Sequence, residues 1–118
     1  MTFLDTHVIV WLYEKKLELF PKNIQEILEE DDLDVSPIVV LELEYLFECK
    51  KIKVRGKKIV DYLIKNLGLA IADESFSDVI RNTILEDWTR DPFDRVITAH
   101  ARMKKATLLT KDKVIRKN

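Results

Sequence analysis

The chain has 118 residues, of which 47% are hydrophobic and 35% are charged, and its formal net charge is −1. This length is typical of one domain, here residues 1–118, and the apolar fraction excludes an intrinsically disordered chain. The longest apolar stretches, such as residues 38–41, are far shorter than the ~20 residues that span a bilayer, so we expect no membrane segment.

The N-terminus and the single cysteine favour a cytoplasmic protein. Asp5 and His7 stand where a secretion signal would need a basic region and a small-residue cleavage site. Cys49 is the only cysteine, which excludes an internal disulfide and suits a reducing compartment. We expect Cys49 to be a buried small residue rather than a nucleophile, because neither histidine is an evident partner for it.

Four short apolar segments predict the strands of a central sheet. In chain order they are residues 2–4, 33–35, 69–72 and 107–109. Helix-like sequence separates each segment from the next, and this alternation is typical of a parallel sheet with helices on both faces. We therefore predict the α/β class.

The helices between these strands have recognisable ends. Thr6 can cap a helix in the segment HVIVWLYEK, and Ser36 and Asp91 are each followed by a proline, as at many helix starts. Apolar residues at helical spacing predict three more helices, within residues 21–30, 59–67 and 79–84. Gly68 is expected to end the second of these three.

Four carboxylates lie at positions that a parallel sheet would bring together. Asp5 and Asp112 follow the first and last strands, Glu42 interrupts the apolar residues 37–43, and Asp94 lies in the first turn of a helix. Ligand sites of open α/β sheets form at the carboxyl ends of the strands, so we expect the four acids to converge there. Close carboxylates repel each other, and a hard divalent cation such as Mg²⁺ or Mn²⁺ relieves that repulsion.

Each acid also has a simpler interpretation. Asp5 and Asp112 could be turn residues, Glu42 could pair with a lysine or arginine, and Asp94 is stabilised by the helix dipole in any case. Asp91 is most simply a helix N-cap. His7 lies on an apolar helix, so we expect it to be packed rather than catalytic, and the two histidines and one cysteine have no spacing typical of a zinc site.

Two segments are strongly basic despite the near-neutral total. Residues 50–58, KKIKVRGKK, contain six lysines and arginines and no acid, and the tail from Arg102 onward is also basic. Such patches can neutralise phosphates. A solvated, lysine-rich surface is an equally good interpretation of each patch.

Four blocks of the sequence resemble the PIN domain family, and in particular VapC-type toxins of toxin–antitoxin systems. The blocks are LDTHVIVWL (residues 4–12), SPIVVLEL (36–43), DPFDRVITAHA (91–101) and LLTKD (108–112). They occur in the family's order and cover nearly the whole chain. The resemblance implies a three-layer α/β/α fold around a parallel sheet of four strands. Only KVIRKN follows the fourth block, which leaves the family's usual fifth strand open.

The resemblance further implies a metal-dependent endoribonuclease. Asp5, Glu42 and Asp94 would be the central ligands of Mg²⁺ or Mn²⁺, and Asp112 would coordinate directly or through water. Residues around these ligands would orient them or contact phosphate; the candidates are Thr6, Ser36, Asp91, Arg95 and Thr110. A homodimer and a partner antitoxin are implied in the same way. The alternative is a catalytically silent PIN domain that binds RNA or a protein, and the residues alone do not distinguish RNA from DNA.

Overall fold

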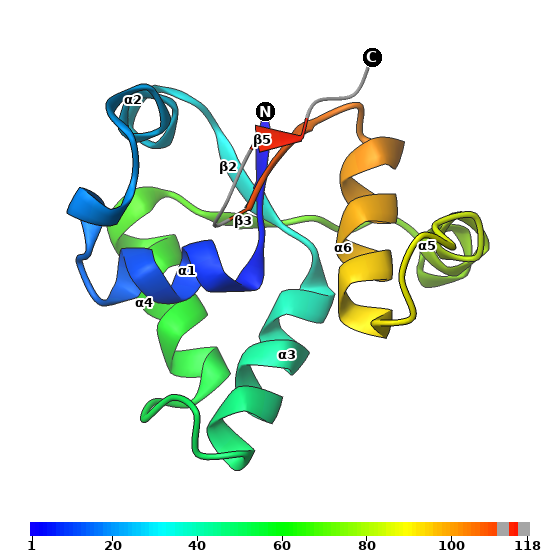
Figure 1. Ribbon diagram of the computed structural model, residues 1–118, viewed down its shortest axis with the longest axis horizontal. Coiled ribbons are helices and arrows are strands. Elements are labelled where there is room, and N and C mark those ends of the chain that lie inside the picture. Colours follow the sequence, from blue (N-terminus) through cyan, green and yellow to red (C-terminus); the bar gives the residue numbers. More distant parts are fainter. Residues whose placement is uncertain (111–113, 116–118) are drawn as a thin grey trace.

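Five short strands form one sheet in the order β3-β2-β1-β4-β5 in the computed structural model of the chain (Figure 1). The structure describes residues 1–110 and, as backbone, residues 114–115. Four strands are parallel and the last pairs antiparallel with β4. Their bounds are β1 Thr2–Leu4, β2 Leu33–Val35, β3 Ala70–Ile71, β4 Thr107–Leu109 and β5 Val114–Ile115.

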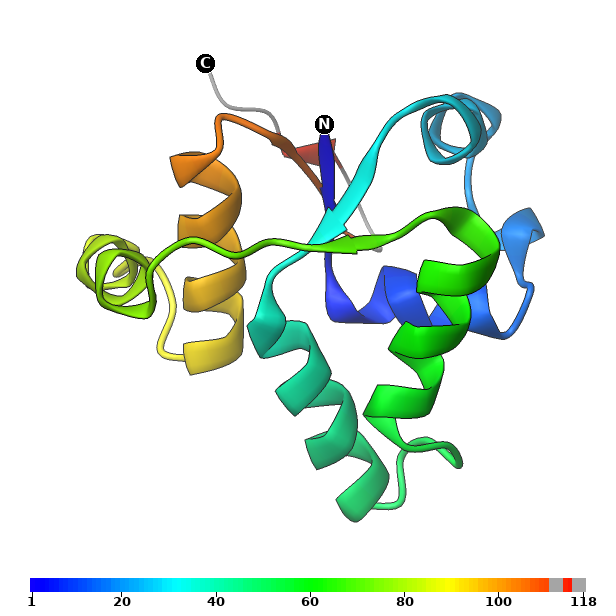
Figure 2. The ribbon, with the colours of Figure 1, turned by 180° about the vertical axis from the view of Figure 1, so that it is seen from behind.

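Helices cover both faces of this sheet, which confirms the predicted three-layer α/β/α arrangement. Figures 1 and 2 show α5 and α6 on one side and α1, α2 and α4 on the other, while α3 runs away from the carboxyl end of β2. None of the helices in residues 1–110 has the length and apolar character of a membrane span. The helices are α1 Thr6–Tyr13, α2 Lys22–Glu30, α3 Pro37–Glu48, α4 Gly56–Leu67, α5 Phe76–Thr83 and α6 Pro92–Met103, with a 3-10 turn at Leu17–Leu19.

The central strand β1 is the middle of the hydrophobic core. Phe3 and Leu4 are completely buried, as are Val35 at the end of β2 and Val39 and Leu43 on α3. A buried side chain of this size contributes about 1.5–3 kcal/mol relative to an exposed one. Apolar burial on both faces of short strands therefore stabilises a sheet whose strands have few hydrogen bonds each.

The chain reverses its direction across the sheet beside β1. From β1 it moves outward through β2 and β3, and it then returns to place β4 on the other side of β1. Leu4 is paired with Leu109, and the Asp5 backbone N–H donates to the Leu109 carbonyl at 3.0 Å. The ends of β1 and β4 are therefore level, and this reversal point is where ligand sites of such sheets form.

The structure confirms the predicted strands and changes some details. The third strand is Ala70–Ile71, shorter than the predicted residues 69–72, and the fifth strand, which the sequence left open, is present at Val114–Ile115. Ser36 and Asp91 are N-caps as predicted. Gly68 ends α4 in the left-handed conformation (φ 69°), which glycine adopts without steric cost.

Three local predictions were wrong. Asp5, not Thr6, is the N-cap of α1, because the Asp5 carboxylate accepts from the Thr6 backbone N–H and Thr6 is already helical. His7 is exposed, because the buried face of α1 is formed by its neighbours Val8 and Ile9. Cys49 is exposed, because it lies just beyond α3, where the chain has left the core.

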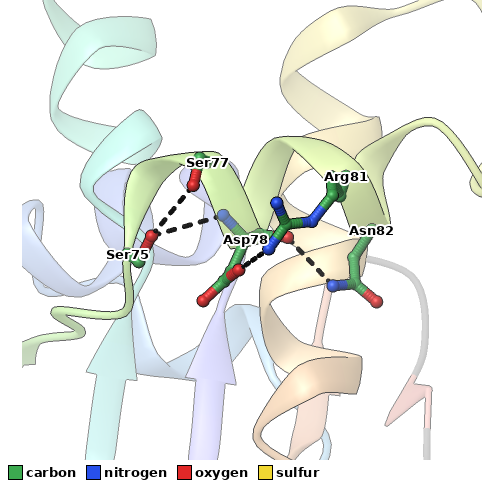
Figure 3. Close-up of polar contacts among 5 residues, drawn as sticks. All are labelled: Ser75, Ser77, Asp78, Arg81 and Asn82. Atoms are coloured by element: carbon green, nitrogen blue, oxygen red, sulfur yellow. Dashed lines mark hydrogen bonds and ion pairs between the residues drawn. The ribbon is translucent and has the colours of Figure 1, made fainter.

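Helix α5 has a polar face that is satisfied by its own residues (Figure 3). The Ser75 hydroxyl accepts from the Asp78 backbone N–H at 3.4 Å, Asp78 pairs with Arg81, and the Asn82 side chain donates to the Asp78 carbonyl at 2.9 Å. Phe76 on the same helix is 79% exposed. This helix therefore combines a self-contained polar face with uncovered apolar side chains.

Candidate metal centre

Three of the four predicted ligands come together at the carboxyl edge of the sheet. Asp5 follows β1, Glu42 lies on α3, and Asp94 lies in the first turn of α6. The charges of Asp5 and Asp94 both raise the pKa of Glu42, and the charge of Asp5 raises that of Asp94. The three carboxylates are thus electrostatic neighbours, although they are 37 or more residues apart along the chain. Asp112 lies outside the described residues.

Glu42 is the most perturbed acid of this cluster. Its partial burial raises its pKa to about 7, the charges of Asp5, Asp91 and Asp94 add to this effect, and a hydrogen bond from Thr6 opposes it. The Thr6 hydroxyl donates to Glu42 Oε1 at 2.5 Å. At neutral pH Glu42 is therefore divided between its acidic and ionised forms. A nearby cation would favour the ionised form.

Asp91 shapes the surroundings of Asp94. The Asp91 carboxylate caps α6 by accepting from the backbone N–H groups of Phe93 at 2.9 Å and Asp94 at 3.2 Å. Burial raises the pKa of Asp94, and the charges of Asp91 and Asp5 raise it further. His7 opposes this rise. His7 was missed as a site neighbour, although its position two residues after Asp5 was a usable signal.

The other predicted supporting residues differ in what they contact. Thr6 reaches a predicted ligand directly, through Glu42. Ser36 instead shares a hydrogen bond with the ring of His100, and the Arg95 guanidinium donates to the Ile84 carbonyl at 3.3 Å, toward the end of α5. Thr110 directly follows β4 and is half-buried at the same edge of the sheet.

The carboxylate oxygens of Asp5, Glu42 and Asp94 are chemically suited to bind a hard divalent cation. Carboxylate oxygens are the ligands that Mg²⁺ and Mn²⁺ prefer, and the raised pKa values of Glu42 and Asp94 reflect a local excess of negative charge that a cation would offset. Within residues 1–110, no three acidic, histidine or cysteine side chains are already arranged as a metal-binding group. The three carboxylates are therefore neighbours rather than a finished coordination sphere.

A buried histidine that the sequence did not single out lies behind this edge. His100 on α6 is 1% exposed, and both ring nitrogens are hydrogen bonded, Nδ1 to Ser36 Oγ and Nε2 to Glu74 Oε1, each at 2.8 Å. Hydrogen bonds from Lys104 and then His100 lower the pKa of Glu74, so this carboxylate accepts and Nε2 carries the proton. His100 thus joins α6 to the start of α3, the two helices that carry Asp94 and Glu42.

Comparison with known proteins decides the family. The model of the PIN domain matches residues 2–118. The chain belongs to the PIN domain family. This PIN domain is similar in structure to a chain in the crystal structure of VapBC2 from Rickettsia felis bound to a DNA fragment from their promoter. The TM-score is 0.61 at 22% sequence identity, over 91% of this chain and 84% of that one. No curated protein sequence matches.

The family assignment agrees with the positions of the carboxylates. All four blocks that carry the resemblance fall within the matched residues 2–118. Asp5, Glu42 and Asp94, the acids of the first three blocks, are the ones that the structure brings to one edge of the sheet. The PIN fold is therefore established here by the matched family and by the architecture together.

Proposed function

We propose that this PIN domain is a metal-dependent endoribonuclease that hydrolyses RNA phosphodiester bonds. One observation carries the proposal: Asp5, Glu42 and Asp94 converge where the strand order reverses, and the pKa of Glu42 rises to about 7. Crowded carboxylates destabilise a fold unless something compensates their charge. A bound divalent cation is the simplest compensation.

Asp5, Glu42 and Asp94 would hold Mg²⁺ or Mn²⁺, with Asp112 as a further ligand, directly or through water. When bound, the ion would supply an acidified water for in-line attack and neutralise charge on the phosphate. The chain's own residues orient these ligands: Thr6 fixes Glu42 Oε1, and Asp91 fixes the first turn of α6 that carries Asp94. In this proposal Ser36 and Thr110 support the ligand-bearing segments and Arg95 contacts phosphate.

We further propose that the protein is a VapC-type toxin of the cytoplasm, with an antitoxin partner and a homodimeric form. The similar structure is that of a VapBC2 complex, which supports a protein partner. Two apolar surfaces are available for such contacts. One is a groove of about 580 Å³ between α1, α2 and α4, lined in part by Leu12, Leu28 and Leu67. The other surrounds α5, where Phe76 and Ile84 are exposed.

Nuclease activity is tested by incubating the protein with total RNA and Mg²⁺. We expect fragments that disappear on adding EDTA and in the variant Asp94→Asn. Asp32→Asn is the matched control, because Asp32 is an exposed acid just before β2, at the amino end of the sheet, and it should cleave like the wild type. Cleavage that survives EDTA or Asp94→Asn would contradict the proposal.

The second candidate is a PIN domain that binds RNA or a protein without cutting. It is favoured by the finding that no described side chains form a ready-made metal-binding group. A silent domain would bind RNA equally with and without Mn²⁺ and would release no fragments. Titration of Mn²⁺ into the wild type and into Asp5→Asn separates the two, since only the nuclease requires Asp5 for metal binding.

A further inference from the structure

The segment called here the basic loop, residues 50–58, comprises the connection from α3 to α4 and the first turn of α4, and it lies at the far end of α3 (Figures 1 and 2). All six of its lysines and arginines are exposed. Within the described part of the chain, Arg55 pairs with Glu44 and Lys57 with Asp61, and no ion pair involves the other cations. Those remaining cations are Lys50, Lys51, Lys53 and Lys58. The loop therefore presents uncompensated positive charge.

The loop is held firmly against α3 rather than being a loose tail. Glu44 accepts from the Gly56 backbone N–H at 3.2 Å and pairs with Arg55 at 2.6 Å. The Arg55 guanidinium also lies 4.8 Å from the centre of the Phe47 ring. Gly56 approaches so closely that a Cβ atom there would lie 2.8 Å from the Val40 carbonyl oxygen. The backbone that carries these lysines is thus fixed at its α4 end, which reduces the backbone entropy lost when an anion binds.

One face of α3 leads from the carboxylate cluster to this loop. Glu42, Tyr45 and Cys49 are three and four residues apart, so they lie along the same side of the helix. Tyr45 is 51% exposed and packs beside Phe93, the residue before Asp94, with ring centres 5.8 Å apart. At about 1.5 Å per residue, Glu48 at the end of α3 lies roughly 9 Å along the axis from Glu42, and the basic loop begins two residues later. At the ~3.4 Å spacing of a stacked strand, that distance is about three nucleotides.

We infer that the basic loop binds the phosphates of a single-stranded RNA whose cleaved bond lies at the carboxylate cluster, and that Tyr45 stacks on a base between the two. This inference rests on the proposed nuclease function and adds a binding surface to it. The carboxylates repel phosphate, so affinity for the strand has to come from cations nearby. Tyr45 is an exposed aromatic ring between the basic loop and the carboxylate cluster, and unpaired bases stack on such rings.

The test measures binding of a fluorescent single-stranded RNA by anisotropy at several salt concentrations, in EDTA so that no cleavage occurs. Lys51→Gln/Lys53→Gln should weaken binding about tenfold and reduce the slope of log affinity against log salt by about 1.4, because each lost phosphate contact contributes about 0.7. Lys22→Gln/Lys65→Gln, exposed lysines on α2 and α4, is the control with the same charge change and should keep most of the affinity. Tyr45→Leu should weaken RNA binding, whereas Tyr45→Phe, which keeps an aromatic ring, should bind like the wild type.

Equal losses in both lysine variants, or none in Lys51→Gln/Lys53→Gln, would overturn the inference. Displacement of the RNA by polyglutamate as effectively as by unlabelled RNA would overturn it in favour of an acidic protein partner. The nuclease proposal fails separately. If the wild type binds RNA through the basic loop but never cleaves it with Mg²⁺, the nuclease proposal fails and RNA binding by the loop stands. If the wild type cleaves RNA and Lys51→Gln/Lys53→Gln leaves KM unchanged, the nuclease proposal stands and RNA binding by the loop is refuted.

Discussion

Glu42 shows how one carboxylate can set a pH dependence for the whole fold. Its pKa rises from its ordinary value of 4.5 to about 7 on folding, chiefly through burial. The folded state therefore binds this proton more tightly than the unfolded state does. The resulting stabilisation is complete below pH 4.5 and is lost as the pH rises through about 7. A bound cation would remove this loss, because it favours the ionised carboxylate.

We accordingly expect the metal-free protein to be less stable at pH 8 than at pH 5. After allowance for the partial exposure of Glu42, its share is about 1–2 kcal/mol of unfolding free energy. Glu42→Gln should reduce the difference between the two pH values, whereas Glu48→Gln, exposed at the end of the same helix, should not. Urea unfolding in EDTA measures this. An identical pH dependence in the wild type and Glu42→Gln would contradict the role given to burial.

The two histidines provide a second contrast at the level of single residues. His100→Leu would leave the buried Ser36 hydroxyl without its partner and would remove one of the two side chains that Glu74 binds, the other being Lys104. We expect a loss of about 2–3 kcal/mol. His7→Gln, an exposed position, should change stability by less than about 0.5 kcal/mol. Thermal unfolding of both variants tests this, and equal melting temperatures would refute the structural role of His100.

At the scale of elements, the sequence was sufficient for the strands and helices but not for the contacts between them. Strands such as Thr2–Leu4 and Thr107–Leu109 could be predicted, because a short apolar run between helix-like segments is typical of a buried strand. The cap of α1 was assigned to Thr6 instead of Asp5, because the hydrogen-bond partner of the Thr6 hydroxyl, Glu42, is 36 residues away. The Ser36–His100 hydrogen bond could not be predicted either, because its two residues are 64 positions apart in the sequence.

For the candidate site too, the sequence predicted which residues take part but not the contacts between them. Its acids could be chosen from the sequence because strand ends and an apolar helix are unusual places for a carboxylate. Their perturbed pKa values and the neighbour His7 depend on how α1, α3 and α6 pack, which no local pattern encodes. Asp112 lies beyond the described residues, so its assignment stays a prediction.

The close packing of α4 on α3 at Gly56 leads to a testable prediction about stability. A methyl group at Gly56 would lie within 2.9 Å of the Glu44 backbone nitrogen and the Leu43 side chain, so Gly56→Ala must push the two helices apart. We expect a loss of about 1–3 kcal/mol. Gly68→Asn is a suitable comparison, because nothing lies within 4 Å of a Cβ there and asparagine tolerates a positive φ. Chemical unfolding should rank Gly56→Ala as clearly the less stable; the reverse order would contradict the close approach.

For the whole molecule, the uncovered apolar side chains around α5 bear on assembly. Ile84 is 64% exposed and Leu85 is 74% exposed, and patches of this kind mark protein contacts. If the proposed homodimer uses this surface, Ile84→Glu/Leu85→Glu should give a monomer in sedimentation equilibrium. Leu19→Glu, on the other side of the sheet and 47% exposed, should leave the dimer intact. A wild type that is monomeric at all concentrations would contradict the dimer.

The central claim is that Asp5, Glu42 and Asp94 share one divalent cation, and metal-linked proton release tests it most directly. Calorimetric titration of Mn²⁺ at pH 7 in two buffers of different ionisation enthalpy gives the number of protons released. Because the pKa of Glu42 is about 7, we predict binding with release of about half a proton, with the release reduced in Glu42→Gln and binding lost in Asp5→Asn. Absence of binding in the wild type, or equal binding by Asp5→Asn, would contradict the account.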